Sequence, residues 1–256
     1  MRIASWNVNS IKARLDNVGD WLQSANVDVL LLQELKGESF PEDIFKEWGY
    51  AHQIVVGQKA YNGVALLSKL PIADPIRALP GDDADAQARF VGGTVGGIRI
   101  YGLYLPNGNP KGTEKFSYKL AWMQRLHTYA ANALAKNETV LFTGDFNVIP
   151  QSFDAKNPSR WVDDALYSPE ARAAFQSLVN LGYIDAFRAL HPEDHSYTFW
   201  DYTGGALQRN DGIRIDHFLL SPEAADRLNA CTIDKKPRTM EKASDHTPII
   251  VDIAAT

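Results

Sequence analysis

Residues 143–150 read TGDFNVIP and directly follow the apolar run ETVLF (138–142), so a carboxylate and an amide stand where a predicted strand ends. The same arrangement recurs in KASDHTPIIVDI (242–253), where an Asp-His pair immediately precedes an apolar run. Loops at strand ends are where functional sites tend to be built. Gly-Asp and Ser-Asp are also common turn and cap signals, so either stretch alone is compatible with a structural role. Whether these two stretches are turns or part of a functional site therefore depends on what stands at the other strand ends.

The apolar runs of the chain indicate a mixture of strands and helices. Helical patterns occur at 114–136, 14–25 and 168–182, and the last opens with Ser-Pro-Glu and closes on Gly. Nine runs bounded by Gly, Pro, Asn or Asp read as strands: 2–8, 27–34, 50–56, 63–68, 98–105, 139–145, 195–199, 214–221 and 247–253. Several strand pairs are too close for a helical crossover, which points to mixed or antiparallel sheets. The pattern predicts an α/β fold with two packed sheets and helices outside them.

Composition bounds the kind of protein. The 256 residues are 45% hydrophobic and 22% charged, which suits one domain spanning 1–256 with a substantial core. We expect no signal peptide and no membrane span, and the single cysteine, Cys231, fits a reducing, cytoplasmic location. The net charge of −5 argues against a protein that coats nucleic acid through charge alone, but not against an enzyme that holds a short piece of it.

Most strand candidates deliver a polar residue at one end. These residues are Asn7, Asn9, Glu34, Tyr104, Asp145, Asn147, Asp216, Asp245 and His246. Glu34 follows the mostly apolar run 29–33, so it lies at the mouth of a buried strand and not on a solvated face. Because acids recur in this position four times, clustered acids of one site explain the pattern better than four unrelated turns.

The ligand types are hard oxygens with one imidazole and no thiolate cluster. They suit Mg²⁺, with Mn²⁺ as a substitute, and no spacing typical of a zinc site is present. Such a toolkit fits phosphate ester hydrolysis, in which a metal stabilises charge and an acidic residue aligns or deprotonates water. The chain has no GxxxxGK[ST] loop and no GxSxG elbow, and GGTVGG (92–97) is a strand-turn-strand feature without a following helix.

Nine motifs together resemble the exonuclease III family of apurinic/apyrimidinic endonucleases, within the endonuclease/exonuclease/phosphatase superfamily. They are WNVNSIKAR (6–14), DVLLLQELK (28–36), GQKAYNGVALLSK (57–69), LPGDD (79–83), YLPNG (104–108), TGDFNV (143–148), YTFWDY (197–202), RIDHFLLS (214–221) and EKASDHTPI (241–249). They cover essentially the whole chain. The resemblance implies a four-layered α/β sandwich like that of deoxyribonuclease I.

The resemblance also implies roles around the metal and the water. Glu34 would be the principal metal ligand, with Asp245 and Asn7 in or just outside the coordination sphere. Asp145 would orient or deprotonate the attacking water, and Asn147 would hold a phosphate oxygen beside it.

Four further residues would act on the phosphate. His246, polarised by Asp216, would contact the scissile phosphate, either as a hydrogen-bond donor to the transition state or as a base. Tyr104 would donate its hydroxyl to the phosphate or help the leaving oxygen, and Asn107 would touch the phosphate nearby. An Asp beside imidazole raises its proton affinity and fixes its tautomer, so a cationic donor is physically reasonable.

The resemblance places an abasic-sugar pocket at Phe199, Trp200, Ile213 and Ile215, for which core packing of adjacent strands is an equally good explanation. Ile213 departs from the Trp of some relatives, which would loosen the pocket. Basic residues expected to hold DNA phosphates are Lys59, Lys111 and Arg209, without reading sequence.

A second departure lies beside the metal. Asn9 stands where others have Asp, and Ser10 where some have Gly. The charge near the metal is thereby reduced by one.

The resemblance implies a Mg²⁺-dependent nuclease that hydrolyses the phosphodiester 5′ to abasic sites in double-stranded DNA and processes blocked 3′ ends as exonuclease and phosphatase. One alternative is a 3′-end-processing enzyme with weak abasic-site cleavage. Others are a superfamily phosphohydrolase acting on a non-nucleic-acid phosphoester and a non-catalytic scaffold, although none of the expected catalytic residues is lost. Nothing in the sequence demands more than a monomer.

Overall fold

The first sheet brings the chain's N-terminal strands together with its last two. In the computed structural model, which describes residues 1–254, its order is β11 (Leu228–Ile233), β12 (Ile249–Ile253), β1 (Arg2–Asn7), β2 (Val29–Gln33), β4 (Val64–Ser68) and β3 (His52–Val56). β1 and β2 are parallel, with Asn7 opposite Gln33, and the other pairs are antiparallel. The parallel pairing therefore places Asn7 and Glu34 at the same end of the sheet.

The second sheet repeats this plan with the central strands. Its order is β5 (Ile72–Ile76), β6 (Phe90–Val95), β7 (Ile98–Tyr104), β8 (Val140–Asp145), β10 (Asp216–Leu220) and β9 (Ile184–Asp185). β7 and β8 are parallel, with Tyr104 opposite Asp145. β10 runs antiparallel to β8 and begins with Asp216 opposite Asp145. Three predicted site residues thus share one end of this sheet.

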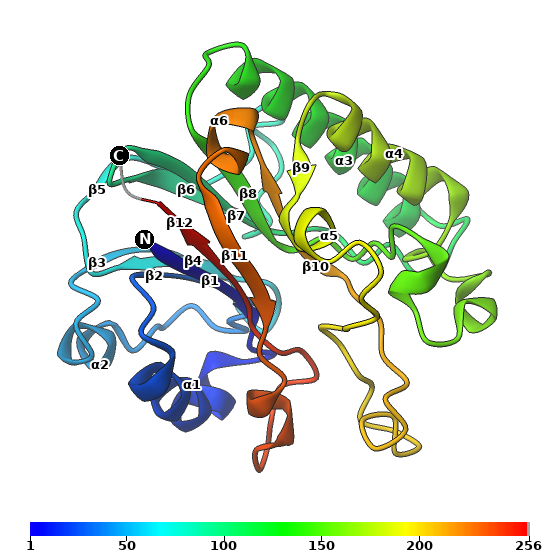
Figure 1. The fold of residues 1–256 in the computed structure, drawn as a ribbon, viewed down its shortest axis with the longest axis horizontal. Helices are drawn as coiled ribbons and strands as arrows, with labels where there is room; N and C mark the ends of the chain where they lie inside the picture. Colours follow the sequence, from blue (N-terminus) through cyan, green and yellow to red (C-terminus); the bar gives the residue numbers. More distant parts are fainter. Residues whose placement is uncertain (255–256) are drawn as a thin grey trace.

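Helices cover the outer face of each sheet, which confirms the predicted four-layered sandwich (Figure 1). α1 (Ile11–Ala25) and α2 (Glu42–Glu47) pack on the first sheet, and α3 (Glu114–Leu134) and α4 (Pro169–Asn180) on the second. The short helices are α5 (Ala186–Leu190), α6 (Pro222–Ala225) and the 3₁₀ turns η1 (Ser152–Asp154), η2 (Pro158–Trp161) and η3 (Lys236–Thr239). Within residues 1–254, no helix is long and apolar enough to cross a bilayer.

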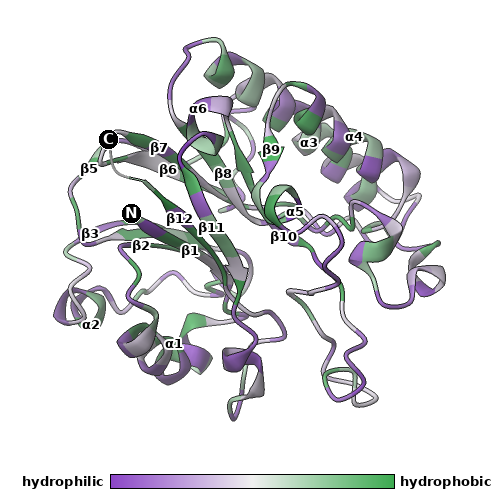
Figure 2. Ribbon diagram, viewed as in Figure 1, coloured by the Kyte–Doolittle hydropathy of each residue, from purple (hydrophilic) through white to green (hydrophobic). Residues whose placement is uncertain are grey.

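Alternation along the strands builds three apolar layers. In β2, Val29 and Leu31 pack between the sheets, whereas Leu30 and Leu32 pack toward α1 and α2. Because both faces of this strand are covered, its run of apolar residues is unbroken. Figure 2 shows the hydrophobic residues gathered on the strands and the hydrophilic ones on the outer faces of the helices.

Segment 195–199 is not a strand, contrary to the sequence prediction. It contains only two isolated bridges, in which Phe199 pairs with Ile213 and with His246. The hydroxyl of Thr198 accepts hydrogen bonds from the main-chain N–H groups of Ile215 and Asp216, each at 3.1 Å. Main-chain hydrogen bonds to residues 213, 245 and 247 are confined to residues 198–200, and the Thr198 hydroxyl adds to them, so no continuous ladder forms.

The nine predicted strands did not include β5, β6, β9 and β11, although the strand-turn-strand feature GGTVGG (92–97) overlaps β6. β5 is an edge strand that contains Pro75 and a register shift, and both features weaken the strand pattern. β9 is only two residues long, and β11 is a half-exposed edge strand.

Gly144 allows β7 and β8 to approach closely just before Asp145. Its φ is +144°, and a Cβ atom built there would overlap the main-chain carbonyl of Leu103. We expect Gly144→Ala to lower the free energy of unfolding by about 2–4 kcal/mol, read from its urea midpoint. The control is Gly37→Ala, whose new Cβ would lie 3.6 Å from the nearest carbonyl and should change stability by less than about 0.5 kcal/mol. Equal midpoints for the two variants would contradict this account.

Candidate active site

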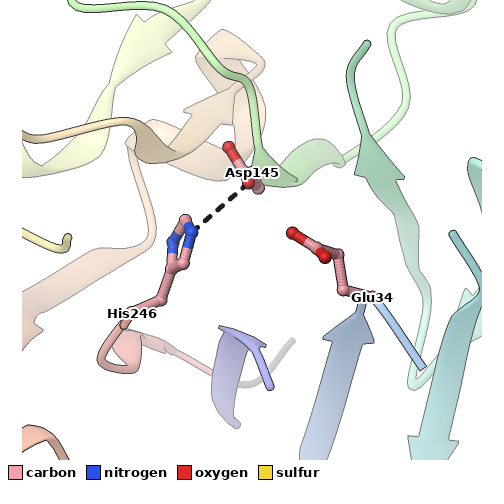
Figure 3. Close-up of side chains that lie close together, drawn as sticks. All are labelled: Glu34, Asp145 and His246. Atoms are coloured by element: carbon pink, nitrogen blue, oxygen red, sulfur yellow. Dashed lines mark ion pairs between the residues drawn. The ribbon is translucent and has the colours of Figure 1, made fainter. Parts of the chain in front are cut away.

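Asn7 joins the two sheets at the centre of the site. Its Nδ2 donates to Glu34 Oε1 at 2.9 Å and to Asp145 Oδ2 at 3.0 Å, and the residue is fully buried. One ligand atom from each of Glu34, Asp145 and His246 lies within 4.8 Å of the other two, and Figure 3 shows the three side chains converging. The strand ends that the sequence pointed to therefore meet in one place.

Glu34 is held in its ionised form. Burial alone would raise the pKa of its carboxyl, but the hydrogen bond from Asn7 and the charge of Lys36 outweigh it, so that the pKa is lowered. The Lys36 ammonium lies 3.0 Å from Glu34 Oε2. Glu34 also has a φ of +54°, an uncommon conformation for a residue other than glycine.

His246 lies between two carboxylates. Its Nδ1 donates to Asp216 Oδ2 at 2.8 Å, and its Nε2 is 3.6 Å from Asp145 Oδ2. Burial disfavours the cation, but Asp216 and then Asp145 outweigh burial and raise the pKa of the imidazole. The ring is therefore an imidazolium at neutral pH, with its outer N–H directed toward the carboxylate of Asp145.

Asp145 is buried and fixed by two donors. One oxygen accepts from Asn7, and the other accepts from the main-chain N–H of Asn147 at 2.8 Å. Burial raises the pKa of this carboxyl, although the charge of His246 opposes the rise. A carboxyl group with an elevated pKa is a better proton acceptor than an ordinary one.

Two amides and a phenol lie beside this carboxylate. Asn107 donates through Nδ2 to Asn147 Oδ1 at 3.2 Å, and Asn147 Nδ2 donates to the carbonyl of Leu105 at 2.8 Å. Burial raises the pKa of Tyr104 well above its usual value, and the charges of Glu34 and Asp145 add to the rise. The Tyr104 hydroxyl thus stays protonated and able to donate.

Asp245 lies at the edge of the group. Its Oδ1 accepts from Asn9 Nδ2 at 3.0 Å, and Asn9 in turn accepts a hydrogen bond from Lys36. A chain of contacts therefore links Asp245 to Glu34 through Asn9 and Lys36. The neighbouring residue, Ser10, caps the N-terminus of α1, since its hydroxyl accepts a hydrogen bond from the main-chain N–H of Ala13.

The donor set fits a divalent cation of the Mg²⁺ type. Glu34 and Asp145 offer carboxylate oxygens, with one imidazole nearby and no thiolate. The Oδ1 atom of Asp216 is buried without a hydrogen-bond partner. One carboxylate oxygen beside the site thus lacks a protein donor, and negative charge is concentrated in one small volume.

A pocket opens beside the imidazole. Phe199, Ile213 and Ile215 belong to one apolar cluster, and the ring of Phe199 lies 5.1 Å from that of His246. Phe199 and Ile213 line a cavity of about 200 Å³ with Trp161, Asp164 and Arg209.

The structure does not bring Trp200 into this cluster. Its ring packs with Tyr197 and Ala206, and Nε1 donates to Asn210 at 3.2 Å. Adjacent residues of an extended segment point to opposite sides, so Phe199 and Trp200 face different neighbours.

The three basic residues predicted to hold DNA lie on different sides of the site. Arg209 is exposed at the rim of the cavity and lies 3.5 Å from Asp211. Lys59 is exposed in the loop after β3, and Lys111 is half-buried in the loop before α3.

A hollow of about 610 Å³ extends from Tyr104 and Asn107 toward the loop after β3. It is lined by Gln58 and Tyr61, the neighbours of Lys59 in that loop. Open surface therefore continues on both sides of the strand ends.

Sequence reasoning missed Lys119. It is fully buried on the inner face of α3, at helical spacing from Trp122, Met123 and Leu126. A lysine at an apolar-face position is the signal that could have identified it, because lysine is almost never fully buried without a partner.

Comparison with known proteins places these features in a family. The sequence pattern of the Endonuclease/Exonuclease/phosphatase family matches residues 4–246. Exodeoxyribonuclease III of Haemophilus influenzae is 34% identical over 97% of this chain and 98% of its own length.

Solved structures agree with this likeness. An AP endonuclease from Archaeoglobus fulgidus superimposes with a TM-score of 0.94 at 36% identity, covering 99% of both chains. A 3′ phosphatase from Neisseria bound to a product DNA hairpin gives a TM-score of 0.96 at 36% identity, again covering 99% of both.

Proposed function

This chain belongs to the endonuclease/exonuclease/phosphatase family, within its exonuclease III branch, and from that membership we propose that it is a metal-dependent DNA-repair nuclease. It hydrolyses phosphodiesters of duplex DNA 5′ to abasic sites and also processes 3′ ends as exonuclease and phosphatase. The observation that carries the proposal is the convergence of Glu34, Asp145 and His246, joined through Asn7 at the meeting point of the two sheets.

The mechanism follows from the positions of the donors and acceptors. Asp145 takes a proton from a water molecule, whose oxygen attacks phosphorus as the bond to the 3′ oxygen breaks. The imidazolium of His246 donates a hydrogen bond to the phosphoryl oxygens, where negative charge grows. Asn107 and Asn147 hold those oxygens, and the protonated hydroxyl of Tyr104 donates to the phosphate or to the leaving oxygen.

The metal would be held mainly by Glu34, with Asp245 and Asn7 beside it. When bound, a divalent cation stabilises negative charge on the phosphoryl oxygens and the leaving group. We propose Mg²⁺ as this ion, with Mn²⁺ as a substitute, because the donors are oxygens and thiolates are lacking.

The abasic-site preference rests on the cavity lined by Phe199 and Ile213. Its apolar wall would accept an extruded sugar that lacks its base and exclude an intact nucleotide. A 3′-end-processing enzyme with weak abasic-site cleavage remains the second candidate, since a relative of nearly identical fold is a 3′ phosphatase.

We also propose that residues 1–256 form one domain that acts as a monomer in the cytoplasm. Strands of both sheets contribute to a single apolar layer between them, which supports the single domain.

Incision of a labelled duplex tests the function. A 5′-labelled duplex with one abasic-site analogue should be cut once, at the lesion, in Mg²⁺, and should stay intact in a chelator. The undamaged duplex of the same sequence is the control. Progressive shortening from the 3′ end would favour the second candidate. The proposal would be overturned if the abasic duplex, the undamaged duplex and a duplex ending in a 3′-phosphate all stayed intact.

A further inference from the structure

Three loops of the site meet around one buried cation. The ammonium of Lys119 donates to the main-chain carbonyls of Asn107 at 3.0 Å, Asn147 at 2.6 Å and Ala165 at 3.3 Å. An ammonium has three N–H donors, so these carbonyls satisfy all of them. The first two are main-chain carbonyls of the residues whose side-chain amides are placed on the scissile phosphate. The third belongs to Ala165, which follows Asp164 in the wall of the cavity.

The chain around the lysine stem is shaped to admit it. Gly108 has a φ of +86°, and a Cβ atom built there would lie 2.6 Å from the Cδ of Lys119. It would also lie 3.4 Å from the Cβ of Ala165. The methylene groups therefore run through a narrow passage between two of the three loops.

The same loops also bind one another. Asn109 donates through Nδ2 to Asp164 at 2.9 Å and accepts from the main-chain N–H of Ala165, also at 2.9 Å. Ile149 N donates to the carbonyl of Leu166 at 2.8 Å. Lys119 lies at the centre of this junction, and no carboxylate of the described residues forms an ion pair with it.

We propose that Lys119 is a positioning residue, whose ammonium ties the three loops through their carbonyls and so holds the Asn107 and Asn147 amides on the scissile phosphate. This inference rests on the proposed function. An isolated cation in a dry interior is costly unless it is fully hydrogen-bonded, so a role confined to filling space would be better served by an apolar residue.

Burial and the nearby acids act on the Lys119 ammonium in opposite directions. Burial lowers its pKa to about 7, although the charges of Asp145 and Asp164 oppose the fall. The two acids thus offset part of the cost of burial, and the three carbonyls accept the N–H groups of the protonated amine.

A double-mutant cycle with Asn107 tests the role. The enzyme variants are Lys119→Met, Asn107→Ala and the double variant, assayed for kcat and KM on the abasic duplex in Mg²⁺. Lys119→Met should lower kcat by about 30- to 100-fold and change KM by less than about threefold. In the Asn107→Ala background the same change should cost at least about threefold less, because one of the two amides through which Lys119 acts is gone.

Two further measurements separate positioning from folding. Thermal unfolding must show each variant folded at the assay temperature, and Lys119→Gln replaces Lys119→Met in the cycle if the latter does not fold. Lys136→Met, which removes an exposed lysine just beyond α3, should leave kcat and KM unchanged.

Equal losses of kcat from Lys119→Met in both backgrounds, or an unchanged kcat, would overturn the positioning role while the wild-type enzyme remained active. A wild-type enzyme that cleaves neither the abasic duplex nor a 3′-phosphate would instead overturn the proposed function, and the role with it.

Discussion

Replacing Asp145 with asparagine is expected to lower kcat for phosphodiester cleavage by about 10³-fold or more. The amide cannot accept a proton from water. It also keeps only one acceptor atom, whereas the carboxylate accepts from both Asn7 and the main-chain N–H of Asn147. Single-turnover cleavage of the abasic duplex measures the loss, and a mobility shift in chelator measures binding, which should stay within about fivefold of wild type.

The matched control for this variant is Asp74→Asn. Asp74 is an exposed acid of β5 with a φ of +47°, a conformation that asparagine tolerates well. The Asp74→Asn variant removes one negative charge at a distance from the site, as a control for the charge lost at Asp145, and should leave cleavage unchanged. Near-normal turnover by the Asp145 variant would refute its assignment to the water, while loss of duplex binding in that variant alone would assign it to substrate binding instead.

The central residues of this site were predictable because each follows or precedes an apolar run. Glu34 comes directly after β2, and Asp145 ends β8, so the apolar runs of these strands are enough to predict that both residues lie at strand ends. That the two ends meet depends on how the two sheets stack. From sequence, the stacking follows only from the resemblance of the whole chain to a family.

Other features could not be read from local sequence. The YTF segment has β-branched and aromatic residues typical of a strand, but its main-chain pairing is limited to residues 198–200 and is supplemented by the hydroxyl of Thr198. The position of Lys119 on the apolar face of its helix could have marked it as buried, but its three acceptors come from three separate loops that the sequence does not bring together. Such contacts belong to the tertiary structure.

Replacing Asp216 with asparagine is expected to change the pH dependence of cleavage as well as its rate. In the wild-type protein, Asp216 and Asp145 outweigh the effect of burial and raise the pKa of His246 to about 10. The imidazolium therefore persists through neutral pH and is lost only in the alkaline range. Without the Asp216 charge, burial is opposed only by the smaller effects of Asp145 and Asp245, so the pKa of His246 falls and the imidazolium is lost at a lower pH than in the wild type.

Cleavage measured from pH 6 to 9 then distinguishes the two roles left open for His246. If the imidazolium is the working form, the Asp216→Asn variant loses activity as pH rises, by about tenfold for each unit above its new pKa. If neutral imidazole acts as a base, the same variant gains activity as pH rises through the lowered pKa and exceeds the wild type. His246→Gln reports the pH dependence that remains without the imidazole, including that of Asp145, since its amide has N–H donors but does not titrate. The buried His217 beside Asp216 does not interfere, because burial and the charge of Arg214 lower its pKa to about 4, below the whole range. We expect the first outcome, because Nε2 of His246 faces a second carboxylate, that of Asp145, which favours a proton on that nitrogen.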